Sequence, residues 1–422
     1  MPRRILITTT GSLGDVHPYM AVGLELQARG HAVTLATSNF YRSKVENAGL
    51  GFAPMGPHYT PEDTGVVQAI MDPWRGPEYL LRRFLYPVIR EVYAEIRNAV
   101  GRADVLVTHG LSFAAHIAAA ETGVPWVSTV LAPSAFFSAF DPPLVNPFPG
   151  LHRALRLCSP AVNRAFHKPI RAITLKWAAP IRDFRASLGL DPGGNPLFEA
   201  QHSPQRVLAL FSRVLAEPQP DWPPHTSVTG FAFYDYEEHG RAIDPALPRF
   251  LDSGPVPVVF TLGSAAVHVA GQFYKTSLDA VRRLKCRAVL LTGGNAVDEP
   301  LPPDVMALRY APYSQILPRA AAVVHQGGIG TTAQVLRAGR PALVVPFAFD
   351  QPDNAARAER LGVAKSIPRR RYEAGRAARA LDDLLADSRF SMAAAGVAEH
   401  IGREDGARAA ADAIEAHANG RR

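Results

Sequence analysis

Several features that mark other classes of protein are scarce in this 422-residue sequence. It has two cysteines, Cys158 and Cys286, too few for a disulfide framework or a cysteine-rich zinc site. Its longest apolar runs, such as 256–262 and 342–347, have the length of a β-strand and fall far short of the roughly 18 residues of a membrane span. These absences exclude a small disulfide-rich domain, a zinc-ribbon protein and a transmembrane helix.

The sequence also has few lysines, and its charged residues are not clustered. The net charge of +7 comes almost entirely from arginines that are spread along the chain. A nucleic-acid-binding protein would gather its charge on one face among aromatic residues, so we expect no nucleic-acid partner. A diffuse excess suits an anionic ligand or a peripheral contact with an anionic membrane surface. Arg3 and Arg4 precede only three apolar residues, too few for a signal peptide, so we expect a cytoplasmic protein.

What the sequence does contain is typical of a two-domain α/β protein. At 47% hydrophobic and 20% charged residues, a chain of this length has enough apolar material for two domain cores. Strand-like and helix-like segments alternate, which predicts two doubly wound domains with parallel sheets. The predicted strands are 5–9, 32–36, 104–108 and 126–130 in the first half and 256–262, 288–292, 322–325 and 342–346 in the second. The predicted helices lie near 18–29, 113–122 and 274–284, from 331 onward and in the tail 374–418.

A proline-rich, acidic stretch from 218 to 248 separates the two halves. We predict a first domain over 1–225, a linker over 226–248, a second domain over 249–400 and a C-terminal helix and tail over 401–422. Two segments, 57–100 and 136–200, hold more aromatics and prolines than the sheets require. They are either helical insertions that pack on a core or the apolar wall of a pocket, or both. Their candidate pocket residues are Phe84, Phe136 and Phe137.

Glycine turns follow a strand in each half. The sequence His325-Gln-Gly-Gly-Ile-Gly-Thr-Thr332 leaves the strand 322–325 and opens a helix. Glycines let a backbone approach a phosphate, and the N–H groups at a helix N-terminus then bind it. The same glycines would also serve a tight turn needed for packing alone. In the first half, Gly11-Ser-Leu-Gly14 follows the first strand and is followed by Asp15.

Three other α/β classes lack their motifs here. A dinucleotide-binding turn needs G-x-G-x-x-G, and Gly11-Ser-Leu-Gly14 does not extend to it. An α/β-hydrolase needs G-x-S-x-G, and Gly110-Leu-Ser112-Phe-Ala114 lacks the last glycine. The sequence has no G-x-x-x-x-G-K-[ST], which excludes a P-loop nucleotide triphosphatase.

The stretch from Tyr310 to Asn354 resembles the donor-binding signature of the UDP-glycosyltransferase family, whose members have the GT-B fold. The turn 11–18 resembles the opening of its bacterial branch and of sterol glucosyltransferases, and 228–235, 260–264 and 349–362 resemble a rhamnolipid-forming rhamnosyltransferase. The resemblance covers essentially the whole chain and keeps the motif order. It implies two facing Rossmann-like domains, an N-terminal one for the acceptor and a C-terminal one for the nucleotide sugar. It also implies a C-terminal helix that crosses back to the first domain.

The resemblance assigns a role to each matching donor-site residue. Tyr310 stacks on the nucleotide base, and the Ala311 backbone hydrogen-bonds its edge. Asp350 and Gln351 hydrogen-bond the sugar hydroxyls. The residues expected to face or hold the pyrophosphate are Ser264, His325, Gly328, Gly330 and Thr331, and Gly14 is a further candidate for donor binding. Plant members of the family hold the ribose with a glutamate where this sequence has Ala333, followed by Gln334, which leaves a uridine or a thymidine donor open.

Inverting sugar transfer needs a base on the acceptor hydroxyl. Our candidate is Asp15, because the bacterial branch that it resembles has an aspartate there. The alternative is that this aspartate is the N-cap of the following helix, a common role for aspartate. His109 stands where histidine-type members have the partner aspartate, and we expect it to orient Asp15 or accept its proton. His17 and His116 are rivals for that role, and His17 is also a candidate acceptor contact.

These expectations combine into an inverting hexosyltransferase. We expect a UDP-glucose or dTDP-sugar donor and a hydroxyl on a lipophilic natural product, phenolic, sterol or lipid. Two alternatives stay open: a rhamnolipid-type dTDP-rhamnose transferase and a non-catalytic nucleotide-sugar-binding activator. We expect no cofactor besides the donor and no metal. The nearest approach to D-x-D is Asp235-Tyr-Glu237 in the predicted linker, and a helix N-terminus with His325 can offset the diphosphate charge instead.

Overall fold

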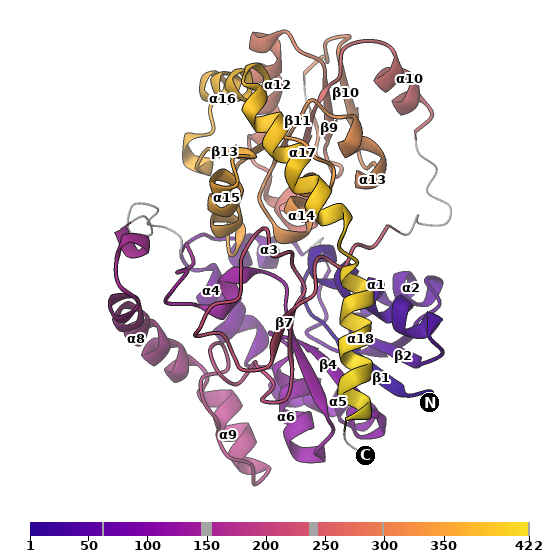
Figure 1. Cartoon of the computed structure of the whole chain (residues 1–422), viewed down its shortest axis with the longest axis vertical. Helices are drawn as coiled ribbons and strands as arrows, with labels where there is room; N and C mark the ends of the chain where they lie inside the picture. Colours follow the sequence, from indigo (N-terminus) through magenta and orange to yellow (C-terminus); the bar gives the residue numbers. More distant parts are fainter. Residues whose placement is uncertain (61–62, 145–153, 236–243, 298, 421–422) are drawn as a thin grey trace. The chain divides into compact units, whose positions relative to one another are not determined.

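The chain folds into two compact units (Figure 1). The computed structural model describes residues 1–60, 63–144, 154–235, 244–297 and 299–420. The first unit comprises Met1–Asp63, Trp74–Tyr234 and Glu404–Arg422, and the second comprises Thr64–Pro73 and Asp235–Arg403. Residues 236–243 of the predicted linker lie outside the described residues.

The first unit is built on a seven-stranded sheet of parallel strands in the order β3-β2-β1-β4-β5-β6-β7. The four strands predicted in this half are present, whereas three short strands were not predicted. One of the three, β7, lies inside the predicted linker and pairs with β6. The strands are β1 (Arg4–Thr8), β2 (Ala32–Thr37), β3 (Gly51–Pro54), β4 (Val105–His109), β5 (Trp126–Val130), β6 (Val207–Ala209) and β7 (Thr226–Val228).

The helix α5 covers part of this sheet with one apolar face. In α5, the residues Ile89, Val92, Tyr93, Ile96 and Val100 recur at helical spacing and are buried, while the charged residues between them face solvent. These side chains share one core with α6 and with the β1 and β4 strands. The helices are α1 (Leu13–Ala28), α2 (Arg42–Asn47), α4 (Gly76–Tyr79), α5 (Ile89–Arg102), α6 (Phe113–Thr122), α8 (Pro160–Trp177), α9 (Ala179–Ser187) and α18 (Gly406–Asn419).

The C-terminal helix α18 belongs to the first unit and packs on α1 (Figure 1). Arg29, at the end of α1, forms ion pairs with Asp412 at 2.5 Å and with Glu415 at 2.7 Å. His31 Nε2 also lies 2.8 Å from Glu415. The predicted return of the C-terminal helix to the first domain is confirmed.

The second unit has six parallel strands in the order β10-β9-β8-β11-β12-β13. The predicted strands are present, and β10 and β13 were not predicted. The strands are β8 (Val258–Thr261), β9 (Ala288–Leu291), β10 (Val305–Leu308), β11 (Ala322–His325), β12 (Ala342–Val344) and β13 (Ala364–Ser366). The helices are α3 (Thr64–Ile70), α10 (Ala246–Asp252), α11 (Gly263–Ala266), α12 (Phe273–Leu284), α13 (Tyr313–Ile316), α14 (Ile329–Arg337), α15 (Gln351–Arg360), α16 (Ala374–Ala386) and α17 (Ser388–Gly402).

The helix α3 comes from the N-terminal half of the sequence but packs in the second unit. Val67 and the adjoining Met71 are 7% and 4% exposed and belong to the same hydrophobic core as Phe260 and Leu290. The sequence prediction had placed this segment with the first domain.

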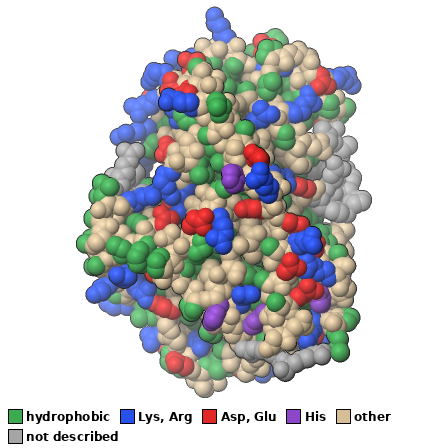
Figure 2. All heavy atoms as spheres, viewed as in Figure 1, with side chains coloured by type: hydrophobic (Ala, Val, Ile, Leu, Met, Phe, Trp, Pro, Cys, Tyr) green, Lys and Arg blue, Asp and Glu red, His purple; other side chains and the backbone are tan. Residues whose placement is uncertain are grey.

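On the face that Figure 2 shows, basic and acidic side chains are interspersed, as expected for arginines spread along the sequence. Among the described residues, no helix has both the length and the apolar character to cross a membrane.

Candidate functional site

The strand order reverses at one place in each sheet. In the first unit, β2 and β3 extend from one side of β1, and β4 to β7 extend from the other; in the second, β8 and β11 form the equivalent pair. Ligands of open parallel sheets bind beyond the carboxyl ends of the strands at such a reversal. His109 is the last residue of β4, and His325 is the last residue of β11. The two predicted histidines therefore occupy equivalent positions in the two units.

Asp15 lies in the first turn of α1, at the third helical position. The N-cap is Ser12, whose backbone N–H donates to Asp15 Oδ2 at 2.8 Å, while Gly14 N–H donates to Ser12 Oγ at 3.3 Å. This reciprocal arrangement is a capping box. The alternative that Asp15 is itself the N-cap is therefore wrong, although one of its two oxygens does serve the cap. A side chain at Gly11, whose φ is +131°, would place Cβ 2.2 Å from that oxygen, so this turn requires glycine.

The other carboxylate oxygen of Asp15 faces His109. Oδ1 lies 3.9 Å from His109 Nε2, which is an ion-pair distance and longer than a direct hydrogen bond. The imidazole is buried, and its Nδ1 accepts a hydrogen bond from the Leu111 N–H at 3.3 Å. A neutral imidazole that accepts at Nδ1 carries its proton on Nε2, so the N–H points at Asp15.

Burial and mutual charge act in opposite directions on this pair. Desolvation raises the pKa of Asp15, and its contact with His109 and the hydrogen bonds from Ser12 partly oppose that rise. Desolvation lowers the pKa of His109, and the Asp15 charge opposes the fall. Burial thus makes Asp15 more basic and keeps His109 neutral more readily, which are the shifts that proton abstraction by a carboxylate requires.

The two rival histidines have other surroundings. His116 is buried, its Nε2 lies 3.2 Å from Thr108 Oγ1, and its ring tilts against Trp126 at 5.1 Å between centroids. Burial lowers the pKa of His116 to about 3, so it is neutral at pH 7. The ring of His17 lies 4.9 Å from that of Tyr234. Neither of these arrangements resembles the Asp15–His109 pair.

The three candidate acceptor phenylalanines have different environments. Phe84 packs edge-on against Tyr59 at 5.0 Å, and burial together with the Asp15 charge raises the pKa of Tyr59 to about 12. Phe137 is partly buried and lies 4.4 Å from the ring of Phe198. Phe136 is only 8% exposed and stacks on Trp222 at 4.1 Å. That stack gives Phe136 a packing role, whereas Phe84 is linked through Tyr59 to the surroundings of Asp15.

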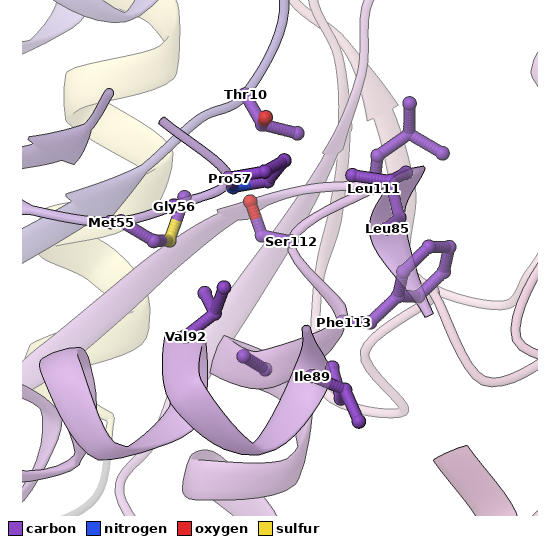
Figure 3. A pocket seen from close by; sticks show the side chains of 11 residues that line it. Thr10, Met55, Gly56, Pro57, Leu85, Ile89, Val92, Leu111, Ser112 and Phe113 are labelled. Carbon is purple, nitrogen blue, oxygen red and sulfur yellow. The ribbon is translucent and has the colours of Figure 1, made fainter. Parts of the chain in front are cut away.

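A small apolar cavity adjoins Thr10, in the turn before α1, and Leu111 and Ser112, which follow β4 (Figure 3). Its volume of about 20 Å³ has room for about one water molecule. Ser112 is 3% exposed, and its hydroxyl has no hydrogen-bonding partner among the described residues. Figure 3 shows that hydroxyl pointing toward Pro57 and Thr10. The lining residues are Thr10, Met55, Gly56, Pro57, Leu85, Ile89, Val92, Leu111, Ser112, Phe113 and Ala114.

In the second unit, His325 repeats the geometry of His109. It is 1% exposed, and its Nδ1 accepts from the Gly327 N–H at 3.0 Å, two residues further on, as His109 accepts from Leu111. Burial lowers the pKa of His325 to about 3. The ring is therefore neutral at pH 7 with its proton on Nε2. It lies beside the start of α14, where Gly328 is the N-cap.

Two residues that the sequence analysis missed hold the glycine turns of this unit together. Gln326 donates from Nε2 to Thr331 Oγ1 at 3.3 Å, and a Cβ on Gly263 would lie 2.4 Å from the same nitrogen. The Tyr313 hydroxyl lies 2.7 Å from Thr261 Oγ1, at the end of β8. Gln326 is buried and Tyr313 is partly buried. Gln326 lies within the glycine motif itself, and this position could have indicated from the sequence that it belongs to the site.

Asp350 and Gln351 both have structural contacts besides their predicted role. Asp350 Oδ2 accepts from the Ile329 N–H at 3.2 Å and from Asn354 Nδ2 at 2.7 Å, so it contacts the first turn of α14. Gln351 Oε1 accepts from the backbone N–H groups of Phe347 at 2.8 Å and Ala348 at 3.1 Å. A sugar hydroxyl bound by Gln351 would therefore meet its amide N–H groups.

The nucleotide side of this site shows one exposed ring. Tyr310 follows β10 and is 50% exposed, as a ring that stacks on a base requires, while Ala311 is buried. Ala333 is 4% exposed on the inner face of α14. Gln334 accepts a hydrogen bond from Arg337 at 2.7 Å. Ser264 is partly exposed in α11, directly after Gly263. In the part of the chain that the structure describes, no three His, Cys, Asp or Glu side chains are grouped as a metal site requires.

Comparison with known proteins identifies the family of this chain. A family model described as the glycosyltransferase family 28 N-terminal domain matches residues 5–125, and one described as the erythromycin biosynthesis protein CIII-like C-terminal domain matches 276–413. The chain is 34% identical over 426 residues to O-mycaminosyltylonolide 6-deoxyallosyltransferase of Streptomyces fradiae, covering 98% of this chain and 97% of the relative. It is 30% identical over 369 residues to glycosyltransferase GtfE of Amycolatopsis orientalis, covering 85% of each.

Two solved structures share the fold. The glycosyltransferase of kitacinnamycin aligns over 99% of both chains with a TM-score of 0.70 and 24% identity. Spinosyn rhamnosyltransferase SpnG, complexed with thymidine diphosphate, aligns over 98% of this chain and 100% of its own with a TM-score of 0.67 and 17% identity. The protein is a glycosyltransferase with the GT-B fold. It belongs to the family of hexosyltransferases that includes the tylonolide 6-deoxyallosyltransferase, and the predictions of family, fold class and enzyme class are confirmed.

Proposed function

We propose that this glycosyltransferase moves a hexosyl group, with inversion, from a nucleoside diphosphate sugar to a hydroxyl of a lipophilic small molecule. One observation carries the proposal. In each unit, a strand at the reversal of the sheet ends in a buried histidine whose Nδ1 accepts a hydrogen bond from the backbone N–H two residues further on. In the first unit the Nε2 of that histidine lies 3.9 Å from the carboxylate of Asp15, and in the second unit the histidine is followed by Gly328, the N-cap of α14.

The second unit is suited to the diphosphate. The first N–H groups of α14 lack partners within the helix and carry the positive end of its dipole, and His325 adds a neutral N–H donor. Donors that are fixed before the reaction stabilise the charge that develops on a leaving diphosphate. No cofactor besides the donor is part of the proposed reaction.

Within this proposal, a thymidine diphosphate sugar is the preferred donor. The position where plant members of the family hold the ribose hydroxyls with a glutamate is Ala333, which is buried and has no polar side-chain atom. A deoxyribose lacks the 2′-hydroxyl that such a glutamate would bind. The absence of the glutamate therefore weakens the binding of a thymidine donor less than that of a uridine donor. The tylonolide relative transfers a 6-deoxyhexose, and the SpnG structure contains thymidine diphosphate. UDP-glucose remains the comparison that the experiment must include.

Asp15 is the proposed base. Its Oδ1 takes the proton of the acceptor hydroxyl as that oxygen forms a bond to the anomeric carbon, and the bonding pair to the diphosphate leaves with the diphosphate. Oδ2 stays fixed by the Ser12 N–H. His109 points an N–H at Asp15, so in its neutral form it is a hydrogen-bond donor. This favours an orienting role for His109 over a proton-accepting one.

The acceptor is proposed to be lipophilic because the relatives of this chain include sterol 3-beta-glucosyltransferases. The cavity near Asp15 has mainly apolar walls, in keeping with such an acceptor, but holds only about one water molecule. Both cysteines are free thiols, which suits the reducing cytoplasm as the proposed compartment.

We also propose a peripheral contact with an anionic membrane, made by a surface of the first unit that includes the helix α8.

The donor assignment is tested by thermal stability with saturating dTDP, UDP, GDP and NAD. A ligand at 100 times its Kd adds about 2.7 kcal/mol to the free energy of unfolding. We expect stabilisation by dTDP, a smaller one by UDP, and loss of both in His325→Ala. His116→Asn is the matched control, since it removes a buried histidine from the other unit. A response to NAD alone would overturn the proposal.

The base is tested by sugar transfer in Asp15→Asn. Asparagine keeps an oxygen that can accept from the Ser12 N–H, so the helix cap is retained while the base is lost. Removing a general base lowers kcat by roughly 10²- to 10⁴-fold. The control is Ser12→Ala, which loses about 1 kcal/mol of stability as an N-cap deletion and keeps the carboxylate. Transfer by Asp15→Asn near the wild-type rate would rule Asp15 out as the base.

A further inference from the structure

The helix α8 and the residues before it carry charge of one sign. From Ala154 to Arg182 the sequence has six Lys or Arg residues and no Asp or Glu. Arg156 and Arg171 are paired with Asp141 and Glu199, which come from other segments. The two lysines of this stretch, Lys168 and Lys176, form no ion pair with any residue that the structure describes. From the sequence, positive charge was judged to be spread over the whole chain, and the absence of acidic residues from 154–182 was not recognised.

Polar contacts attach α8 to the first unit by its inner face. Asn163 Nδ2 donates to the Ala139 carbonyl at 2.8 Å, and Thr174 Oγ1 accepts from Asn195 Nδ2 at 2.7 Å. His167 is 6% exposed and its ring lies 6.4 Å from that of Phe137. The helix is therefore held by hydrogen bonds on the side where most surface helices place their apolar residues.

The outer face of α8 mixes lysine with apolar side chains. Ala161, Ala165, Lys168, Ala172 and Lys176 recur at helical spacing along one exposed stripe. At its border, Val162 and Ile173 are each 50% exposed, and Leu157, just before the helix, is 91% exposed. Figure 2 shows hydrophobic and basic side chains together at the left edge of this face, where Figure 1 places α8.

We propose that this outer face, comprising Leu157, Val162, Lys168, Ile173 and Lys176, docks on an anionic lipid bilayer. A helix with basic and apolar side chains on one exposed face lies in the headgroup region, with its lysines on anionic lipids and its apolar groups in the acyl boundary. Binding of an acidic protein partner would require only the basic side chains. It would not explain why three aliphatic side chains of this face are exposed. A nucleic-acid site would interleave aromatic residues with the charge, and the exposed stripe of α8 has none.

Vesicle binding tests the proposal on the full-length protein. The probes are vesicles of phosphatidylcholine alone and vesicles with one third phosphatidylglycerol. We expect binding to the anionic vesicles only, weakened by raising salt, because surface charge is screened. The double variant Lys168→Gln/Lys176→Gln should lower the partition coefficient by about 30-fold, at about 1 kcal/mol per lost charge. Leu157→Ser should lower it by roughly tenfold through lost apolar burial.

The matched control is Arg283→Gln/Arg379→Gln, which removes two exposed charges from α12 and α16 and should leave vesicle binding unchanged. A second measurement uses the exposed thiol of Cys158, beside Leu157, in a Cys286→Ser background. An environment-sensitive fluorophore on Cys158 should shift to the blue when anionic vesicles are added.

Several results would overturn the proposal. They are equal loss of binding in the α12/α16 control, no spectral shift at Cys158, or binding to polyglutamate or to DNA without binding to vesicles. The inference does not depend on the reaction. Stabilisation by dTDP and sugar transfer to a water-soluble acceptor should be unchanged in Lys168→Gln/Lys176→Gln, so failure of this proposal and failure of the proposed function are distinguishable.

Discussion

At the scale of single residues, the site depends on which nitrogen of a histidine carries the proton. In both His109 and His325, the backbone N–H two residues further along the chain donates to Nδ1. The tautomer is thus set by the turn that follows the strand and not by another side chain. A residue type alone could not reveal this, since the same histidine with a different turn would present a lone pair.

The orienting role of His109 predicts a change in the pH profile of kcat/KM. Asp15 must be ionised to act as a base, so activity falls as the pH drops through its pKa. The contact with His109 lowers that pKa. In His109→Ala the acid limb of the profile should therefore move to higher pH. His109→Gln keeps an N–H donor and should move it less. An unshifted acid limb in His109→Ala would contradict the orienting role.

A glycine substitution tests the junction of the two turns in the second unit. In Gly263→Ala, the new Cβ would lie 2.4 Å from Gln326 Nε2, at a residue whose φ is +63°. We expect a loss of about 1–3 kcal/mol in stability and weaker dTDP binding, since the strain falls on the loop beside the proposed phosphate site. Gly65→Ala, with open space around its Cβ, is the control. Unchanged nucleotide affinity in Gly263→Ala would show that Gln326 can move without cost.

The position of Asp15 shows what sequence reasoning could and could not provide. The glycine turn, the strand before it and the choice of Asp15 as a site residue were readable from residue types and from the resemblance. The cap was not, because Pro18 suggested that the helix begins there, a common place for proline. The helix begins instead at Leu13 and includes Pro18. Only the structure shows that Ser12 caps the helix, that Oδ2 of Asp15 accepts the hydrogen bond of the cap, and that Oδ1 faces His109 instead.

At the scale of elements, the strands that the sequence failed to predict lie in the outer parts of the sheets. β3, β10 and β13 are edge strands, and β6 and β7 are the last two strands on one side of the first sheet. Each has three or four residues, too few for an apolar period to emerge. The strands β1, β4, β8 and β11, which flank the reversal of strand order in each sheet, were all predicted, although β8 and β11 also have only four residues.

The helix α3 supports a stability prediction. Met71 is 4% exposed in the core of the second unit, so Met71→Ala should cost about 2–4 kcal/mol as a buried truncation. Met392→Ala is the same chemical change on α17 at a residue that is 70% exposed, and it should cost less than about 0.5 kcal/mol. Urea unfolding of both variants measures the difference. Equal losses would mean that α3 is not part of that core.

At the scale of the whole molecule, buried histidines make stability depend on pH. Burial lowers the pKa of His116 and His325 to about 3 and that of His202 to about 4. An unfolded chain takes up protons at these residues below about pH 6.5, and the folded chain does not. The free energy of unfolding therefore falls as the pH is lowered from about 6.5, by up to about 4 kcal/mol per pH unit for three such groups.

Urea unfolding between pH 7.5 and 5.5 measures this dependence. His116→Gln should remove about a third of the slope, because it takes away one of three comparable contributions. A slope that is the same in His116→Gln, or a stability that does not change below pH 6.5, would mean that these histidines take up protons in the folded state.

The path of the chain constrains how glycosyltransferases of this kind can be recombined. The sequence passes from one unit to the other at residues 63–64, 73–74, 234–235 and 403–404. A chimera joined only in the middle would take α18 away from α1 and supply the second core with α3 from a different parent. Exchange of a whole donor unit requires that 64–73 travel with 235–403, while 404–422 stays with its own first unit. Hybrid enzymes made with all four junctions should express and fold where single-junction hybrids fail.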